Sequence, residues 1–247
     1  MNEVKKLGSI LGIWGHPDDE SFLTAGLMAV AIQNGQKVAC ITATRGEQGV
    51  RNEAKWPQAR LGQIREQELK ESFKILGVKY HHWLDYPDGG CVKIDDDEAV
   101  KKVLSYIEKY QPDTIITFAP DGLTGHDDHK SVSRWVRQAL AQHPKPITLL
   151  YGVNTQQQYD KYYKIVDEKF NLYFNIDKPN LVDEKNCDIF LKLPSDISEL
   201  KRQVLSAQPS QTEAMYQALG EDFWLGALGS EAFVKANAKD PTLWPLK

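Results

Sequence analysis

The sequence has few cysteines, and their spacing excludes the sites that cysteines usually build. Its 247 residues include only Cys40, Cys91 and Cys187. Three widely separated thiols cannot form a complete disulfide framework or a CxxC zinc site. Cys40 lies in an apolar run, residues 38–41, that is typical of a buried strand, so we expect an inert core thiol there. This cysteine usage favours a protein of the cytoplasm.

Long apolar runs are also missing. The longest near the N-terminus covers residues 7–15, which is too short to span a bilayer. It ends in His-Pro-Asp-Asp-Glu rather than at a small-residue cleavage site. We therefore expect no transmembrane segment.

Neither sign of charge is in large excess. The chain has 30 Lys+Arg and 34 Asp+Glu, a net charge of −4, so a nucleic-acid partner is not predicted. With 41% hydrophobic and 26% charged residues and no repeat, the composition excludes collagen, coiled coils and long disordered chains. The length favours one domain, 1–247, which we divide into a core at 1–152 and a C-terminal cap at 153–247.

Short apolar runs alternate with helical patterns over the first two-thirds of the chain. The predicted strands are Ser9–Trp14, Lys37–Thr42, Tyr80–Leu84, Thr114–Phe118 and Ile147–Gly152. Between them lie amphipathic stretches, of which the one marked by Val132, Trp135, Val136, Ala139 and Leu140 is the most regular. This alternation predicts an α/β fold, a mostly parallel sheet with helices on both faces.

The last third has a different pattern. Residues 170–176 alternate like a half-exposed strand, whereas 194–207 and 211–219 have helical spacing. We expect this region to add an antiparallel edge and helices to the same core.

Two polar clusters follow predicted strands. Residues 15–20 come directly after the first strand, and residues 125–129 follow the fourth at the start of a helix. In a doubly wound sheet of order 3-2-1-4-5, these strands are neighbours and ligands bind beyond their carboxyl ends. If the strands have this order, the two clusters meet in space.

The residue types in these clusters suit a divalent metal. His16, Asp19 and His129 offer two imidazoles and a carboxylate, a set that binds zinc and also accepts Fe²⁺ or another divalent ion. Asp18 is then free to take a proton from water. His126 shares a helical turn with His129, and Asp128 could keep an imidazole protonated for an oxyanion or leaving group. The alternative is that these aspartates only cap helix N-termini.

The chain resembles the PIG-L/LmbE-type metal-dependent deacetylases from Leu11 to about Gln211. The resemblance rests on His-Pro-Asp-Asp-Glu at 16–20 and His-x-Asp-His at 126–129. It extends to the Gly-Glu loop at 44–49, the Arg-x-x-Glu-Leu helix motif at 65–69 and Tyr-Pro-Asp-Gly at 86–89.

The resemblance implies a Rossmann-like fold and the removal of an acetyl group from an N-acetylglucosamine-containing molecule. It implies zinc on His16, Asp19 and His129. The catalytic and sugar-binding roles that it implies are Asp18 as general base, His126 oriented by Asp128 as acid or oxyanion stabiliser, and Glu47, Arg65 and Asp88 as sugar contacts.

The three implied sugar contacts have ordinary alternatives. Arg65 shares a helix face with Leu61 and Leu69, so it needs a partner or a ligand, and pairing with a neighbouring glutamate or snorkelling would also satisfy it. Glu47 lies in a loop where charges are commonly solvated, and Asp88 occupies a typical turn sequence.

One motif departs from the family. Many members have His-x-Ser-Gln near the C-terminal end, whereas this chain has Gln208 at the histidine position. The departure leaves the predicted metal ligands in place and affects only the substrate contacts expected from this segment.

The first hypothesis is therefore a zinc-dependent N-deacetylase acting on a small aminosugar compound. The alternatives are an amidase that cleaves a larger amide of an aminosugar thiol conjugate, and a sugar- or metal-binding module without turnover. The sequence leaves open the conjugate, the native metal and whether the chain forms a homo-oligomer.

Overall fold

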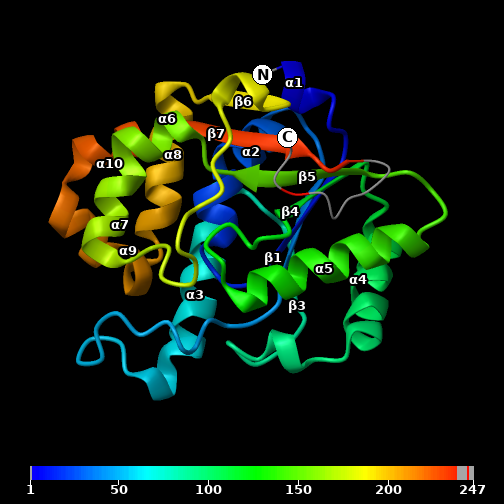
Figure 1. Cartoon of the computed structure of the whole chain (residues 1–247), viewed down its shortest axis with the longest axis horizontal. Coiled ribbons are helices and arrows are strands. Elements are labelled where there is room, and N and C mark those ends of the chain that lie inside the picture. Colours follow the sequence, from blue (N-terminus) through cyan, green and yellow to red (C-terminus); the bar gives the residue numbers. More distant parts are fainter. Residues whose placement is uncertain (1, 238–243, 245–247) are drawn as a thin grey trace.

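The chain folds around one seven-stranded sheet. The computed structural model describes residues 2–237 and 244. Its strand order is β3-β2-β1-β4-β5-β7-β6 (Figure 1), and β1 to β5 are parallel while β7 is antiparallel to both of its neighbours. The strands are β1 Ile10–Trp14, β2 Val38–Thr42, β3 Tyr80–Trp83, β4 Thr114–Phe118, β5 Thr148–Val153, β6 Ile189–Lys192 and β7 Ser230–Lys235. The predicted mostly parallel sheet, its order 3-2-1-4-5 and its antiparallel edge are confirmed.

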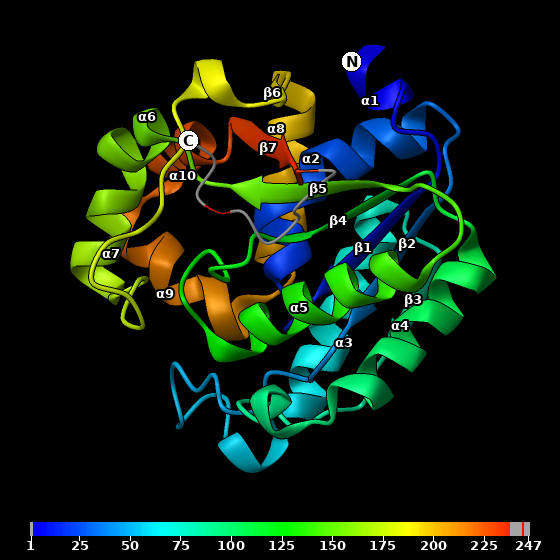
Figure 2. The ribbon, with the colours of Figure 1, turned by 45° about the vertical axis from the view of Figure 1, so that its right-hand side comes forward.

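Helices cover both faces of this sheet. The chain crosses one face through α2 and α3, with α8 packed against both, and the other face through α4 and α5 (Figures 1 and 2). The helices are α1 Asn2–Lys5, α2 Asp19–Gln33, α3 Gln58–Leu76, α4 Asp96–Tyr110, α5 Asp127–Gln142, α6 Gln156–Gln158, α7 Lys164–Phe170, α8 Ser195–Ser206, α9 Pro209–Leu219 and α10 Glu221–Ala227. Within residues 2–237, no helix is long and apolar enough to cross a membrane.

The parallel strands form the centre of the core. Every residue of β1, β2 and β4 is buried, as is Cys40 in β2. Trp14 of β1 and Trp135 of α5 are fully buried, and burial of such side chains stabilises the fold by about 2 kcal/mol or more each. The core thus holds the strand ends, and the loops that follow them, in fixed positions.

The C-terminal third corrects one prediction. Residues 170–176 do not form a strand: α7 runs to Phe170, Asn171 ends it with φ 52°, and the following residues are turns. The antiparallel edge comes instead from β6 and β7. The predicted helices are confirmed as α8 and α9, while the division of one domain at residue 152 stays a prediction.

A buried ion pair fastens this third to the sheet. Glu231 of β7 accepts hydrogen bonds from the backbone N–H groups of Gly26 and Leu27 in α2, both at 2.8 Å, and lies 2.7 Å from Lys201 Nζ of α8. Both charged side chains are almost fully buried, so removing one partner would cost about 3–5 kcal/mol. The pair therefore fixes α2, the helix whose first turn carries Asp19.

Candidate functional site

The two polar clusters meet at the carboxyl edge of the sheet. β1 pairs directly with β4, so the loops after them lie side by side. His16 Nδ1 is 3.0 Å from His129 Nε2, and the Asp19 carboxylate lies 3.4 Å from His129 Nε2 and 3.7 Å from His16 Nδ1. The structure therefore brings together the three side chains predicted to bind a metal.

The backbone before α2 is shaped for this approach. A Cβ on Gly15 would lie 2.8 Å from His129 Cδ2, so only glycine leaves room for that ring. Asp18 adopts φ 103°, a conformation that non-glycine residues rarely take and that is often found at functional sites. This turn directs the side chains of Asp18 and Asp19 toward different partners.

The second ring nitrogen of His16 faces two more carboxylates. His16 Nε2 is 2.9 Å from Asp88 and 3.2 Å from Asp128. The fully buried Asp128 carboxylate also accepts hydrogen bonds from the backbone N–H groups of Gly89 and Cys91, at 2.7 and 3.0 Å. Asp128 thus joins the loop after β3 to the N-terminus of α5.

His126 lies beside this cluster at the N-cap of α5. Its ring centroid is 4.7 Å from that of His16, and its Nδ1 accepts the backbone N–H of Asp128 at 3.2 Å. The resemblance implied that Asp128 orients His126; here the backbone of Asp128 does so, while the carboxylate contacts His16. This tautomer leaves the His126 Nε2–H free to donate a hydrogen bond.

The cluster perturbs the ionisation of its members. Burial opposes protonation of His16, but its hydrogen bonds to Asp128 and Asp88 outweigh this and raise its pKa to about 10. Burial raises the pKa of Asp19 to about 7 and also raises that of Asp18, with Arg65 opposing the latter shift. Burial and the nearby His16 hold the pKa of His129 well below its usual range. The cluster thus combines several carboxylates with ring nitrogens in one buried place, where a positive charge is stabilised.

The spacing of the donor atoms fits a metal ion. Ligands at about 2.1 Å from a tetrahedral zinc lie ~3.4 Å apart. His16 Nδ1 and His129 Nε2 are 3.0 Å apart, and the nearest Asp19 oxygens are Oδ2 at 3.7 Å from the first and Oδ1 at 3.4 Å from the second. Donor atoms of His16, His126 and His129, and those of His16, Asp88, His126 and Asp128, also lie within 4.8 Å of one another. The histidine and aspartate cluster centred on His16 therefore has a donor spacing that suits a metal ion.

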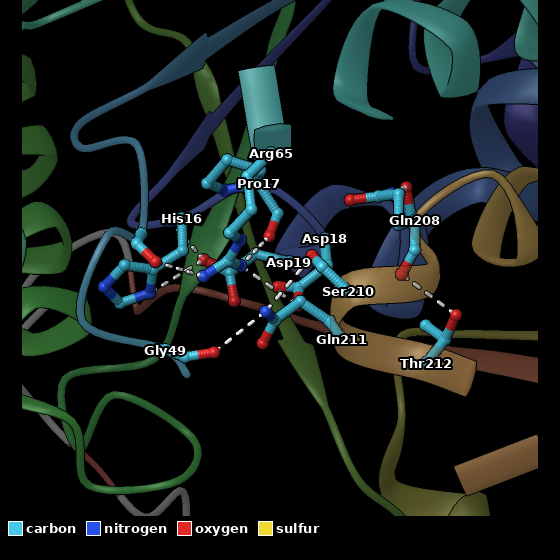
Figure 3. A network of polar contacts seen from close by, with 12 residues as sticks. His16, Pro17, Asp18, Asp19, Gly49, Arg65, Gln208, Ser210, Gln211 and Thr212 are labelled. Atoms are coloured by element: carbon cyan, nitrogen blue, oxygen red, sulfur yellow. Dashed lines mark hydrogen bonds and ion pairs between the residues drawn. The ribbon is translucent and has the colours of Figure 1, made fainter. Parts of the chain in front are cut away.

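Arg65 of α3 connects the loops of the site. Its guanidinium donates to the carbonyl groups of Pro17 and Gly46, the latter at 2.8 Å, and lies 3.2 Å from the Asp18 carboxylate (Figure 3). Arg65 is only 4% exposed, and its buried Nε has no partner among the described residues. These contacts hold the base candidate Asp18 in place, in addition to any role toward a sugar.

Glu47 and Asp88 join the loop after β2 to the loop after β3. Glu47 accepts the backbone N–H of Asp88 at 2.9 Å, and Asp88 accepts that of Gln48 at 2.7 Å. The sequence did not indicate that Asp88 belongs to the ion cluster, because Pro-Asp-Gly-Gly is also an ordinary turn. Asp88 follows β3, which pairs with β2, so its loop lies at the same sheet edge as the cluster. This position was the signal that could have revealed it.

The segment that departs from the family is buried behind Asp19. Gln208 Nε2 donates to Ser21 Oγ at 2.8 Å and Ser72 Oγ at 3.1 Å, and Ser21 in turn donates to the buried Glu20. Gln211 donates to the carbonyl of Gly49 at 2.9 Å (Figure 3). Gln208 therefore supports the first turn of α2 from behind, a role that the sequence did not suggest.

Comparison with known proteins identifies relatives of this arrangement. A deacetylase of Corynebacterium kroppenstedtii named for 1D-myo-inositol 2-acetamido-2-deoxy-alpha-D-glucopyranoside is 31% identical over 54% of this chain and 41% of its own. A probable N-acetyl-alpha-D-glucosaminyl L-malate deacetylase 2 of Bacillus anthracis is 31% identical over 58% of this chain and 63% of its own. The chain thus spans less than two thirds of either relative.

The fold is shared more widely. The N,N'-diacetylchitobiose deacetylase of Pyrococcus horikoshii matches with a TM-score of 0.66 and 21% identity, covering 95% of this chain and 86% of its own. The family model described as PIG-L, GlcNAc-PI de-N-acetylase, matches residues 11–140, more than half of the 247 residues. This match runs from Leu11 in β1 to Leu140 in α5 and includes every residue of the histidine and aspartate cluster, and the chain is therefore a member of the PIG-L family.

Proposed function

We propose that this protein is a metal-dependent N-deacetylase that hydrolyses the acetamido group of a small N-acetylglucosamine compound to an amine and acetate. The observation that carries the proposal is the convergence of His16, Asp19 and His129 beside the Asp18 carboxylate at one sheet edge. A ligand set beside a separate carboxylate is the minimum arrangement for hydrolysis assisted by a metal.

The proposed metal ligands are His16, Asp19 and His129, and zinc is the proposed ion. Bound there, zinc would act as a Lewis acid and make water more acidic, down to a pKa of about 7. The choice of this set is supported by the position of Asp19, whose carboxylate lies within 3.7 Å of both His16 Nδ1 and His129 Nε2, whereas Asp128 already accepts two backbone N–H groups. Fe²⁺ or another divalent ion suits the same donors.

Asp18 is the proposed general base. Its side chain is 17% exposed, compared with 11% for Asp19, so water and substrate can reach it. Burial raises the pKa of Asp18, which makes its carboxylate a stronger proton acceptor, and the Arg65 guanidinium at 3.2 Å opposes this shift.

His126 is the proposed oxyanion stabiliser. Burial and the neighbouring His16 lower the pKa of His126, so its ring is neutral near pH 7. With Nδ1 accepting a backbone N–H, the Nε2–H can donate to the oxygen of the substrate carbonyl as negative charge develops there. Asp128 is the proposed partner that fixes this turn of α5.

The proposed sugar contacts are Glu47, Arg65 and Asp88, from the loops and the helix next to the metal ligands. Glu47 is the only one of the three that is not nearly buried, and it is the strongest candidate for a hydroxyl contact. The relatives are named for different groups attached to glucosamine, an inositol and a malate, so we propose the aminosugar and leave the attached group open. A cytoplasmic location is also proposed, supported by three free cysteines.

Acetate release tests this function directly. The purified protein is assayed for metal content and then incubated with N-acetylglucosaminyl inositol, N-acetylglucosaminyl malate and diacetylchitobiose. We expect bound divalent metal and acetate from at least one compound, abolished by a chelator and restored by zinc. Release of a bulkier carboxylate from an aminosugar thiol conjugate would favour the amidase alternative. Stoichiometric metal with no hydrolysis of any compound would favour a binding module and overturn the proposal.

A further inference from the structure

A second pocket lies at the opposite edge of the sheet. It has a volume of about 430 Å³ and is formed where β1, β2 and β3 begin, between Ile10, Val38 and Tyr80 and the end of α4. Cavities of this size hold small molecules. Five-residue strands separate the two edges by about 13 Å, so this pocket is distinct from the metal site.

The lining of this pocket is positive although the chain as a whole is acidic. The twelve residues include three lysines and two histidines and no aspartate or glutamate: Ser9, Ile10, Lys37, Val38, Ala39, Lys79, Tyr80, His81, His82, Lys109, Tyr110 and Pro112. None of the three exposed lysines has an ion-pair partner in the part of the chain that the structure describes. Asp113, which follows the lining, is already engaged by the N–H and hydroxyl groups of Ser9, each at 2.8 Å.

Lys109 is held in place without being neutralised. Its ammonium lies 3.2 Å from His82 Nε2, which is also 2.6 Å from the Tyr110 hydroxyl, and 5.4 Å from the centre of the Tyr110 ring. An ammonium only donates hydrogen bonds, so His82 Nε2 accepts and the imidazole is neutral. The histidine and tyrosine therefore orient the lysine while its positive charge remains available.

We propose that this pocket binds a small phosphate-bearing anion. Lysine ammonium groups are common phosphate partners, and three of them around a concave site with no carboxylate favour an anion of high charge density. The small volume favours a soluble phosphate compound over an extended polymer. The proposal is independent of the proposed deacetylase activity, because it uses none of the residues of the metal site.

Pyrophosphate is the probe. Binding is measured by calorimetry on the full chain, and its place by the NMR signal of the His82 ring, which touches Lys109. We expect saturable binding with a shift of the His82 signal, weakened at least about tenfold by Lys109→Ala and again by Lys79→Ala, since each removes one direct phosphate contact. Lys101→Ala is the matched control: it removes an exposed charge from the same helix, about 12 Å further along the axis, and should leave binding unchanged.

Two results would overturn the proposal. One is no saturable binding of pyrophosphate at millimolar concentration. The other is binding that Lys109→Ala and Lys79→Ala leave intact but Asp19→Ala abolishes, which would place the anion on the metal centre instead. These outcomes are separate from the acetate assay, so the failure of either proposal can be recognised without the other.

Discussion

The two edges of the sheet shift the pKa values of their histidines in opposite directions. At the carboxyl edge, His16 faces Asp88 and Asp128, and these carboxylates raise its pKa to about 10. Near the amino edge, burial and then His82 lower the pKa of His81 to about 4. The same side chain is thus driven toward its charged form at one edge and its neutral form at the other.

The difference indicates which kind of ligand each edge suits. Acidic and imidazole groups gather at the carboxyl edge because they follow β1, β3 and β4, and a cation would stabilise them together. The amino edge has lysines without acidic partners, which an anion would stabilise. Substitutions at each edge test whether the carboxyl edge binds a cation and whether the amino edge keeps its histidine neutral.

The largest expected effect follows removal of a metal ligand at the carboxyl edge. We expect His129→Ala to lose bound metal and to lower the rate of acetate release by at least about 10³-fold, because a Lewis acid contributes several kcal/mol to such a reaction. Metal analysis and the acetate assay measure both. His143→Ala, which alters a histidine at the other end of α5, is the control. Normal metal content in His129→Ala would refute the proposed ligand set.

Asp18→Asn separates proton transfer from metal binding. The amide keeps the shape of the side chain but cannot accept the proton, so we expect a loss of about 10²–10⁴-fold in kcat with metal content unchanged. Near-normal turnover on the true substrate would assign the base to another residue. Loss of metal as well would mean that Asp18 belongs to the ligand set.

Arg65 offers a smaller effect that distinguishes positioning from simple stabilisation. We expect Arg65→Met to lower kcat by roughly 10–100-fold, because a displacement of about 1 Å at Asp18 has that effect. It should also move the acid limb of the pH profile of kcat/KM to higher pH, since Arg65 lowers the pKa of Asp18. Arg65→Lys should restore the position of the limb but not the full rate. An unmoved limb in Arg65→Met would leave only a structural role.

The sequence predicted the fold and the candidate site only in part. The buried strands and the Val132–Leu140 stripe have strong periodicity, and together with the order of parallel strands they placed the clusters at 16–20 and 126–129 side by side. The contacts of His16 with the carboxylates of Asp88 and Asp128 were not predicted. Asp88 reaches His16 only through the loop after β3, whose path depends on the N–H groups of Gly89 and Cys91 binding Asp128.

The incorrect strand at 170–176 has a related cause. Alternating apolar residues resemble a strand, but here α7 packs against the helical cap and Asn171 turns the chain, so tertiary packing overrides the local pattern. The antiparallel strand β7, which lies between β5 and β6, lacks alternation because four successive residues are buried. Among them is Glu231, whose burial depends on Lys201, a partner that no local pattern reveals.

The smallest expected effect is a change in the free energy of unfolding with pH, and it compares His81 with His16. His81 has a lowered pKa, so its contribution to stability is present above about pH 6.5 and is lost as the pH falls toward 4, where the unfolded chain binds the proton first. His81→Gln keeps a donor for Thr42 but does not titrate. Between pH 7.5 and 4.5 the stability advantage of the parent over this variant should shrink by about 2 kcal/mol, measured by urea unfolding, after allowance for partial exposure of the ring. The stability contribution of His16 depends on pH in the opposite direction. In metal-free protein it is present below about pH 6.5 and is lost as the pH rises through about 10. A His81→Gln variant whose stability keeps a constant offset from the parent over this range would show that the amino edge does not hold its histidine neutral.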